Sequence, residues 1–464
     1  MTDKLGIPKK REQCICLFIC KYALFFVTLQ PDFFNGKIHT TIRMKKVLVI
    51  GGGGREHAIV YALSRSPQVE KIYCAPGNAG IAQLAECVAI KDTDVDGLLL
   101  FAKETEVNLT VVGPEAALAA GVVDAFRKEG MPIFGHTKAA TQIESSKEFA
   151  KIIMDKYHVP TAGYQSFSDY AEALAYVKAG TLPTVLKYDG LAAGKGVVIA
   201  TTLEEADAAL QDMLCNEAFG KGKVVIEDYL EGPEFSFMCF VNGENVYPMP
   251  LSQDHKRAYD NDEGPNTGGM GAYTPLPFVT AEDEAFARKY VLEAVAKGMC
   301  QEGLPLTGVL YGGLMKTANG IKVIEFNARF GDPETEVVLP LLESDAYDVF
   351  YGIATGEEAM RLKGDKAMSW RNEATIGVVL ASKGYPGDYV KGAVIEGVEL
   401  FDGPVFHMGT KNDNGVLKTN GGRVMMCIAT GKNIAEAQAK VYKEIEKIHC
   451  DTLFYRKDIA HWAL

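Results

Sequence analysis

The sequence predicts a multidomain protein that combines an α/β domain on a doubly wound parallel sheet with α+β domains on antiparallel sheets. Short apolar runs alternate with helical stretches after Met44, which is typical of a parallel sheet. Two Asn-Gly steps stand between apolar runs in the middle of the chain and indicate antiparallel hairpins. The length of 464 residues suffices for several domains of roughly 100–200 residues each.

The parallel sheet is expected in the first part of the chain. Residues 47–51 form a short apolar run that ends in glycine, as a strand buried on both faces would. A helical stretch over 55–65 follows. The next expected elements are strands within 71–80, 109–115 and 132–135 and a helix around 98–103. Ligands of such sheets bind beyond the carboxyl ends of the strands.

The middle and the end of the chain have a different pattern. The Asn-Gly steps at 242–243 and 319–320 predict two hairpins, and residues 145–157 predict a helix before them. Apolar runs over 374–382 and 421–430 and a helical stretch over 434–448 indicate a small C-terminal domain. No internal repeat or low-complexity tract interrupts these segments.

Composition excludes some classes of function. The formal net charge is −12, which argues against a nucleic-acid partner, because phosphate backbones are bound mainly by Lys and Arg. The ten cysteines form no Cys-x-x-Cys pair, so we expect no zinc site, and free thiols fit a reducing cytoplasm. We expect a cytoplasmic protein that neither enters membranes nor binds nucleic acid.

The first 43 residues differ from the rest. An apolar stretch over 14–29 follows the basic residues 9–11 and is interrupted by Lys21, so it is short for a membrane span of about 20 residues. It is similar to a signal-peptide core but lacks a nearby cleavage pattern. We interpret residues 1–43 as an extension outside the fold, which a start codon assigned too far upstream would explain. A targeting segment and a structured helix are the alternatives.

A glycine-rich turn, IGGGGREH, follows the first expected strand. It fails the dinucleotide fingerprint, because Glu56 and His57 stand where that pattern requires glycine. An anion bound at the start of the following helix is the functional interpretation, and a tight turn without a ligand is the alternative.

The stretch VIEFNARFGDPE contains a candidate metal site. Side chains alternate along a strand, so Ile324, Phe326 and Ala328 should share one face, and Glu325, Asn327 and Arg329 the other. Polar groups on an apolar strand are costly to bury without partners. A carboxylate and an amide oxygen suit magnesium, which prefers hard oxygen ligands. A solvated strand face is the alternative.

A second glycine-rich stretch, VLKYDGLAAGKGVV, lacks the spacing of a P-loop. Lys187 lies at the end of an expected strand, and Lys147 opens a helix upstream. We expect the lysines to bind nucleotide phosphates, Glu227 to face an adenine amino group, and Glu234 to bind ribose hydroxyls. The residues of this candidate nucleotide site are Lys147, Lys187, Gly190, Gly194, Lys195, Gly196, Glu227 and Glu234.

Together these motifs resemble the ATP-grasp family, and from Met44 onward the chain resembles its phosphoribosylamine–glycine ligases. The matching stretches are VLVIGGGGREHA, APGNAG, VGPE, LKYDGLAAGKGVV, SQDHKR, GPNTGGMGAY, VIEFNARFGDPET, NGGRV and FYRKDI. The resemblance implies an N-terminal α/β substrate domain over 44–145, an ATP-grasp domain over 146–370 with a mobile flap subdomain over about 165–234, and a C-terminal domain over 371–464. The flap would close over the phosphates of ATP.

The resemblance also implies an activity. The family joins glycine to 5-phosphoribosylamine with ATP and Mg²⁺ or Mn²⁺, and it gives glycinamide ribonucleotide, ADP and phosphate. Glu325 and Asn327 would hold the metal ion. Asp254 would face an amino group, and Arg329 would bind a carboxylate or the transferring phosphoryl group. The expected ribose-phosphate contacts are Gly52, Gly53, Gly54, Arg55, Gly77, Asn78, Ala79, Lys411 and Arg423, although Arg423 could instead join two domains.

Other functions fit parts of the sequence. Another ATP-grasp carboxylate–amine ligase would share most of these motifs. A Rossmann-type oxidoreductase would explain the first domain but not the Glu-x-Asn strand, and an inactive binding protein would not need every motif position to be filled. We expect a monomer with small-molecule substrates.

Overall fold

The computed structural model describes residues 44–190, 196–216, 220, 222–356 and 368–464. The expected extension over 1–43 therefore lies outside the described residues, as do Gly194 and Lys195 of the candidate nucleotide site.

The N-terminal part is a parallel sheet in the order β3-β2-β1-β4-β5. Its strands are β1 (Lys45–Gly51), β2 (Val69–Pro76), β3 (Glu86–Cys87), β4 (Leu109–Val112) and β5 (Ile133–Phe134). Its helices are α1 (Gly54–Ser64), α2 (Val95–Glu104), α3 (Glu115–Ala120) and α4 (Val122–Lys128).

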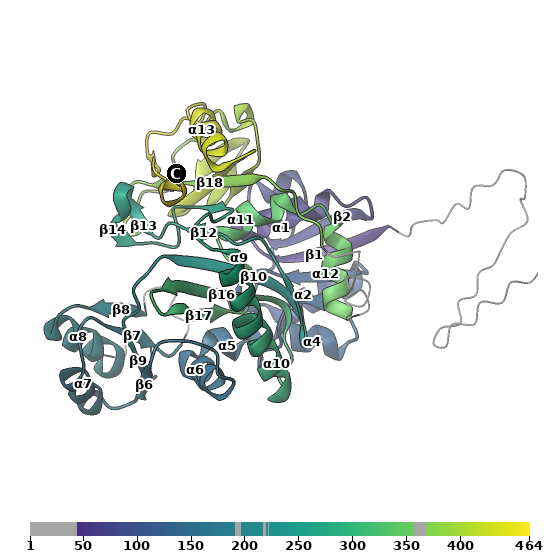
Figure 1. Cartoon of the computed structure of the whole chain (residues 1–464). Helices are drawn as coiled ribbons and strands as arrows, with labels where there is room; N and C mark the ends of the chain where they lie inside the picture. The colour runs from purple at the N-terminus through teal and green to yellow at the C-terminus, as the bar shows by residue number, and fades with distance from the viewer. Residues whose placement is uncertain (1–43, 191–195, 217–219, 221, 357–367) are drawn as a thin grey trace, which may run out of the picture. The chain divides into compact units, whose positions relative to one another are not determined.

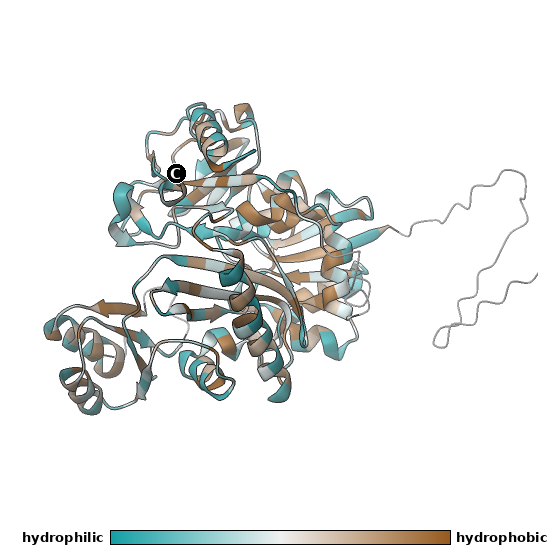
Figure 2. Ribbon diagram, viewed as in Figure 1, coloured by the Kyte–Doolittle hydropathy of each residue, from teal (hydrophilic) through white to brown (hydrophobic). Residues whose placement is uncertain are grey.

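Alternate residues of β1 enter different hydrophobic clusters. Leu48 packs in the cluster that includes α2 and α4, whereas Val49 packs in the cluster that includes α1. Helices therefore cover both faces, and the predicted doubly wound sheet is confirmed (Figures 1 and 2). β1 in the middle of the sheet is apolar from Val47 to Ile50, as suits a strand whose two faces are both buried.

The central sheet is antiparallel in the order β11-β10-β16-β17. Its strands are β10 (Glu234–Asn242), β11 (Asn245–Pro248), β16 (Thr307–Thr317) and β17 (Gly320–Asn327). Both predicted hairpins are present, and the first turns at Gly243, whose φ of +58° lies in the left-handed region that glycine adopts without strain. Helix α6 (Lys147–Lys156) begins where the sequence predicts it, with Ser146 accepting a hydrogen bond from the amide of Phe149.

The prediction that Ile324 shares one face of β17 with Phe326 and Ala328 is wrong. The pairing of β16 with β17 shifts between Gly313 and Leu314, so Glu325 pairs with Gly313 and Val323 with Leu314. The unpaired Ile324 is a β-bulge, which interrupts the alternation of side chains. Phe326 and Ala328 are core residues as predicted, whereas Ile324 is only partly buried, and both Ile324 and Phe326 line the cavity described below.

The flap is a separate antiparallel sheet with its own hydrophobic cluster. The strand order is β6-β9-β7-β8, and α7 and α8 pack on one face (Figure 1). The elements are β6 (Tyr164–Phe167), α7 (Tyr170–Ala179), β7 (Thr184–Tyr188), β8 (Val197–Ala200), α8 (Leu203–Leu210) and β9 (Val224–Asp228). Leu186 and Ile226 enter the cluster, so their neighbours Lys187 and Glu227 lie on the opposite face.

The C-terminal sheet recruits strands from the middle of the chain. Its order is β12-β15-β18-β22-β19, and β23 also pairs with β18. Its strands are β12 (Gln253–Asp254), β15 (Gly271–Thr274), β18 (Ala374–Ser382), β19 (Val405–His407), β22 (Arg423–Gly431) and β23 (Leu453–Phe454). The other helices and strands include α5 (Gln142–Ser145), β13 (Arg257–Tyr259), β14 (Glu263–Asn266), α9 (Ala281–Ala287), α10 (Glu293–Gln301), α11 (Glu334–Val338), α12 (Ala346–Thr355), β20 (Thr410–Asp413), β21 (Val416–Thr419) and α13 (Ile434–Ile445).

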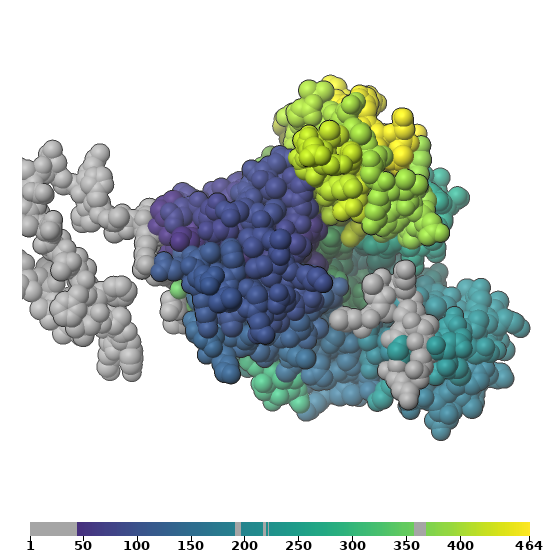
Figure 3. All heavy atoms as spheres, turned by 180° about the vertical axis from the view of Figure 1, so that it is seen from behind, coloured from purple at the N-terminus to yellow at the C-terminus, as the bar shows by residue number. Residues whose placement is uncertain are grey.

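The C-terminal sheet packs against the N-terminal domain, which places its green and yellow atoms beside the purple ones in Figure 3. Asn78 Nδ2 donates to the carbonyl of His407 at 2.7 Å, and the amide of His407 donates to His57 Nδ1 at 2.8 Å. Both histidines are buried, and burial lowers the pKa of His57 to about 3 and that of His407 to about 4. These contacts fix the glycine-rich turns against β19.

His136 joins the end of the N-terminal sheet to β16. Its ring is fully buried, Nε2 donates to the carbonyl of Val309 at 2.7 Å, and Nδ1 accepts from the amide of Thr307 at 3.0 Å. Burial lowers the pKa of His136 to about 4 from the ordinary 6.5, so this histidine is neutral at pH 7. Its stabilising effect is complete above pH 6.5 and decreases as the pH falls towards 4.

We expect His136→Gln to lower the free energy of unfolding at pH 7. The difference from wild type should narrow by up to about 1.4 kcal/mol per pH unit between pH 6.5 and 4, because only the wild-type unfolded chain takes up the extra proton. Urea unfolding at several pH values measures this difference. A difference that stays constant over this range would contradict the neutral buried imidazole.

In the part of the chain that the structure describes, no helix combines the length and the apolar character needed to cross a membrane.

Candidate functional site

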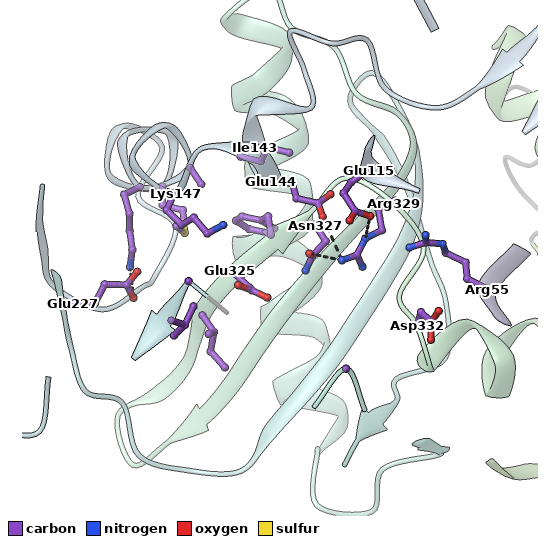
Figure 4. Close-up of a pocket in the computed structure, with 18 of the residues that line it drawn as sticks. Arg55, Glu115, Ile143, Glu144, Lys147, Glu227, Glu325, Asn327, Arg329 and Asp332 are labelled. Carbon is purple, nitrogen blue, oxygen red and sulfur yellow. Dashed lines mark hydrogen bonds and ion pairs between the residues drawn. The ribbon is translucent and has the colours of Figure 1, made fainter. Parts of the chain in front are cut away.

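A cavity of about 380 Å³ lies where the N-terminal, central, flap and C-terminal sheets meet. Figure 4 shows its labelled side chains, with Lys147 and Glu227 at one end, Arg55 and Asp332 at the other, and Glu325 and Asn327 between them. The charged and amide side chains that line it are Arg55, Glu115, Glu144, Lys147, Lys151, Glu227, Glu325, Asn327, Arg329, Asp332 and Arg423.

The row Glu325, Asn327 and Arg329 projects from the end of β17 into this cavity, as predicted. Burial favours the neutral form of Glu325, but the charges of Lys187, Lys256 and other cations outweigh burial and lower its pKa. Glu325 is therefore an ionised carboxylate among several cations, a setting that suits a metal ion bound together with phosphates.

The residues present fit a hard divalent cation. Among the described residues, the carboxylate of Glu325 accepts no hydrogen bond, so its oxygens are available as ligands. Asn327 Oδ1 accepts from Arg329 Nη2 at 3.0 Å and retains a second lone pair. The described residues contain no cluster of three or more His, Cys, Asp or Glu side chains that could hold a metal ion. Magnesium needs only one or two protein ligands when it shares substrate phosphates.

Of the two predicted lysines, Lys147 lines the cavity, and Lys187 lies behind its wall. Lys147 lies at the amino end of α6, and its Nζ donates to the carbonyl of Gly190 at 2.9 Å. Lys187 on β7 is 3% exposed, and its Nζ donates to the carbonyl of Ile324 at 2.8 Å. Lys187 thus joins the flap to the metal strand, and Gly196 at the start of β8 lines the same cavity.

Glu227 is held by a lysine pair. Its Oε1 lies 3.0 Å from Lys187 Nζ, and its Oε2 lies 3.0 Å from Lys151 Nζ. Its carboxylate contacts these two ammonium groups, and its expected role towards an adenine amino group stays a prediction.

Lys151 is a residue that the sequence analysis missed. It is 2% exposed, and burial lowers its pKa to about 8 although Glu227 opposes this shift. Its position four residues after Lys147, on the same face of α6, was the available signal.

An apolar wall on the flap was also missed. Val197 and Ile199 on β8 are 40% and 48% exposed, although valine and isoleucine are usually buried. They alternate with the core residue Ala200 and lie on the same face of the flap sheet as Lys187, and Val197 lines the cavity. A flat apolar face beside two lysines suits a nucleotide base and its phosphates.

Two acids hold Arg329. Its Nη2 lies 3.3 Å from Glu144 Oε1, and its Nε lies 3.6 Å from Glu115 Oε2. Burial raises the pKa of Glu144, whose Oε2 also accepts from the amide of Ala328 at 2.7 Å. These acids come from α5 and α3, far from β17 in sequence, so only the fold reveals the cluster.

The glycine-rich turns pack against each other at the carboxyl end of the parallel sheet. A Cβ atom at Gly52 would lie 2.6 Å from the carbonyl oxygen of Gly77, so any side chain at Gly52 would separate the two turns. Asn78 Nδ2 donates to the carbonyl of Gly52 at 2.9 Å. Gly53 and Gly54 begin α1, and the next residue, Arg55, reaches the cavity.

The other expected ribose-phosphate contacts lie in different places. Ala79 lines a second cavity next to His57 and His407. Lys411 is exposed on the β20–β21 hairpin and does not line the main cavity. Arg423 does line it, but its Nη1 lies 2.9 Å from Asp332 Oδ1 and donates to the carbonyl of Gly268 at 2.6 Å. Of the two interpretations of Arg423, these contacts favour a joint between domains.

Asp254 and Glu234 are near each other but do not line the main cavity. Lys256 Nζ pairs with Glu234 Oε2. Burial raises the pKa of Asp254, and the neighbouring acids Glu334 and Glu234 add to this effect while Lys256 opposes it. The charge of Lys256 also lowers the pKa of Glu325, so this acidic and basic cluster lies next to the metal strand.

Three domain models of one family match nearly the whole described chain. Residues 45–144 match the phosphoribosylglycinamide synthetase N domain, residues 145–335 its ATP-grasp (A) domain, and residues 375–462 its C domain. The chain belongs to the phosphoribosylglycinamide synthetase family. It is thus an α/β and α+β multidomain protein with a central ATP-grasp domain, as the sequence predicts.

Named relatives agree with this family. The chain is 52% identical over 422 residues to a phosphoribosylamine–glycine ligase of Halalkalibacterium halodurans, which covers 90% of the chain and 97% of the relative. It is 49% identical over 428 residues to the ligase of Escherichia coli O6:H1, covering 90% and 99%.

Solved structures show the same architecture. The crystal structure of a phosphoribosylamine–glycine ligase from Thermotoga maritima matches with a TM-score of 0.78 at 33% identity, covering 89% of the chain and 100% of that structure. A biotin carboxylase from Campylobacter jejuni matches with a TM-score of 0.69 at 14% identity, covering 90% and 94%, which shows a shared fold alone. Members of the phosphoribosylglycinamide synthetase family are ATP-dependent ligases. This chain is therefore an ATP-dependent ligase.

Proposed function

We infer that this chain is an ATP-dependent phosphoribosylamine–glycine ligase that acts in purine biosynthesis. It joins glycine to 5-phosphoribosylamine and gives glycinamide ribonucleotide, ADP and phosphate. The observation that carries the assignment is the single cavity in which Lys147, Glu325 and Asn327 of the ATP-grasp domain meet Arg55 of the N-terminal domain. The names of the relatives that match nearly end to end support it.

The reaction proceeds through glycyl phosphate. A carboxylate is a poor acyl donor because it is an anion, so an oxygen of glycine attacks the γ-phosphoryl group of ATP and ADP leaves. The amine of phosphoribosylamine then attacks the acyl carbon, phosphate leaves, and the amine loses a proton. The chain needs no covalent nucleophile for this route; it positions the reactants, neutralises charge and excludes water.

The nucleotide lies between the flap and the central sheet. Lys147 and Lys187 bind phosphates, and the base packs on the apolar wall of Val197 and Ile199. Glu227 holds Lys187 and Lys151 in place, and Glu234 binds the ribose. The glycine-rich stretch with Gly190, Gly194, Lys195 and Gly196 covers the phosphates.

A divalent cation, Mg²⁺ or Mn²⁺, binds to Glu325 and Asn327. When bound, it supplies positive charge to the transferring phosphoryl group. Arg329, fixed by Glu144 and Glu115, donates to the glycine carboxylate or to that phosphoryl group. The planar guanidinium offers several N–H donors in a fixed arrangement, which suits either anion.

The remaining substrate contacts come from three domains. Asp254 accepts from the amino group of glycine. Gly52, Gly53, Gly54, Arg55, Gly77 and Asn78 hold the ribose 5-phosphate. We assign Arg423 to the joint with Asp332, and Ala79 and Lys411 to positions outside this contact. The proposed division is 44–145, 146–370 and 371–464, with β12 and β15 of the middle segment added to the C-terminal sheet. We propose a cytoplasmic monomer with small-molecule substrates and no nucleic-acid partner.

Isotope transfer tests this function. Glycine labelled with ¹⁸O in its carboxylate should transfer one labelled oxygen to inorganic phosphate per turnover, because the bridging oxygen of glycyl phosphate leaves with the phosphate. Mass spectrometry of the phosphate, with ADP measured in parallel, gives the answer. Unlabelled phosphate, or label in AMP with release of pyrophosphate, would overturn the acyl-phosphate route. Product formed from other amino acids but not from glycine would indicate another ATP-grasp ligase.

A further inference from the structure

The C-terminal segment after β23 contains a buried arginine that the proposed chemistry does not use. Arg456 is 0% exposed. Its Nε and Nη2 donate to the two carboxylate oxygens of Asp458, each at 2.8 Å, and its Nη1 donates to Asp262 Oδ1 at 2.8 Å. The guanidinium thus joins the C-terminal segment to a hairpin almost 200 residues earlier in the sequence.

Further contacts join the same two segments, and we call residues 456–462 with residues 255–262 the clasp. The amide of Asn261 donates to Asp458 Oδ2 at 2.8 Å, and the amide of Lys457 donates to Asp260 Oδ1 at 2.7 Å. The other bonds are from Trp462 Nε1 to Asp262 Oδ2 at 3.1 Å and from the amide of Ala460 to His255 Nε2 at 3.2 Å, and His461 Nε2 lies 3.3 Å from Asp262 Oδ2.

The hairpin pairs β13 with β14 at two positions, and Arg257 Nη1 donates to the carbonyl of Gly264 at 2.7 Å, but its tip depends on the clasp. Asn261 and Asp262 at its tip have φ values of +59° and +54°, a left-handed conformation that Asn and Asp adopt more readily than other non-glycine residues and that surrounding contacts stabilise. Ala258 is buried, but Tyr259 is 51% exposed and residues 263–266 are exposed. The polar contacts of the clasp therefore fix the tip of the hairpin, while strand pairing and the contact of Tyr259 with Phe454 hold its base.

Both ends of the hairpin lead into the candidate site. Asp254 directly precedes it, and Lys256 lies near its start; both are next to the metal strand but do not line the main cavity. Gly268 at its end lines that cavity. The backbone amide and hydroxyl of Thr267 donate to the carbonyl of Lys256 at 2.7 and 2.8 Å. A displacement of the tip would therefore reach Lys256, Asp254 and Gly268 at the base of the hairpin.

The energetics of buried ion pairs agree with a geometric role. Burying a guanidinium costs free energy that its partners only partly repay, and apolar substitutes are often at least as stable. A planar donor with three oriented contacts, however, fixes direction as well as distance.

We propose that Arg456 and Asp262 are positioning residues, which act through the 255–268 hairpin to hold Asp254 and Lys256 against the substrates. The proposal rests on the proposed function for the identity of glycine as the ligand of Asp254. Its structural part, that the clasp fixes this hairpin, is independent of the reaction.

The test uses Asp262→Asn in the full chain, because Asp262 is at the tip of the hairpin and its loss leaves Arg456 paired with Asp458. We expect kcat/KM for glycine to fall by about tenfold to a hundredfold, the scale of a misplaced reacting group, with KM for ATP changed less than twofold. Hydrogen exchange should accelerate in residues 255–268 and remain unchanged in β10 and β16. Asp413→Asn is the matched control, because Asp413 pairs with Lys418 on another hairpin of the same C-terminal region; neither quantity should change.

The outcomes separate the two proposals. Unchanged exchange over 255–268 in Asp262→Asn overturns the clasp, whatever the activity. Faster exchange with equal losses for ATP and glycine overturns the positioning role. If wild type forms no ADP from ATP with glycine and phosphoribosylamine, the proposed function fails, and the exchange measurement still decides the structural part. Adding Arg456→Lys to Asp262→Asn should reduce kcat/KM less than twofold further, and a larger additional loss would show that Arg456 acts independently of the hairpin.

Discussion

Replacing Glu325 by Gln should lower kcat by at least about a thousandfold, the upper range for loss of one preorganised electrostatic group. The amide keeps the size of the side chain and removes its charge. Lys187, Lys256, Lys147 and Arg329 would then surround a neutral group, because the carboxylate that now offsets their charge is gone. A divalent cation would lose its charged ligand and meet an uncompensated set of cations.

The measurement is steady-state ADP formation at several magnesium concentrations, with circular dichroism to verify folding. Glu284→Gln on α9 is a suitable control, because Glu284 is exposed and outside the cavity; its kcat should equal that of wild type. Near-normal turnover of Glu325→Gln at limiting magnesium would refute the metal assignment.

Lys187→Met and Lys151→Met should separate catalysis from stability around Glu227. Both lysines contact the same carboxylate, and both are buried. Lys187 also reaches the metal strand and is the cation with the largest effect on the pKa of Glu325. We expect Lys187→Met to lower kcat/KM for ATP by about a hundredfold, as loss of one charge-stabilising donor does.

Lys151→Met should act mainly on folding. Breaking half of a buried ion pair costs about 3 kcal/mol, and Lys187 still holds Glu227 in this variant. Urea unfolding and ATP kinetics on both variants give the comparison. Equal losses of kcat/KM for the two would show that Lys151, like Lys187, contacts the nucleotide.

The cavity also suggests why the family uses several domains for one reaction. Reactive groups on β17 face Arg55 from α1 and Arg423 from β22, while the flap contributes Glu227. An acyl phosphate is hydrolysed readily, so a site assembled from separate elements can exclude water once all substrates are bound. The joints at His136, Asn78 and Arg423 keep these elements in register.

Most helices and strands, and the row of polar residues on β17, could be predicted from local sequence patterns. Local patterns are sufficient where the cause is local: apolar runs set β1 and β4, Asn-Gly steps set the two hairpins, and strand alternation places Glu325, Asn327 and Arg329 on one face. The motifs also identified the family, because their order along the chain is specific even where each alone is weak.

Features that depend on partners distant in sequence became visible in the folded chain. The bulge at Ile324 arises from the pairing of β17 with β16, which no local alternation contains. Lys151 and Glu144 are ordinary helical residues in sequence and become part of the site because helices α5 and α6 pack beside β17. Arg423 meets Asp332, and Arg456 meets Asp262, because the C-terminal sheet recruits β12 and β15 from the middle of the chain. A charged side chain in a folded protein acquires its role from the groups that burial brings to it, and sequence spacing does not specify those groups.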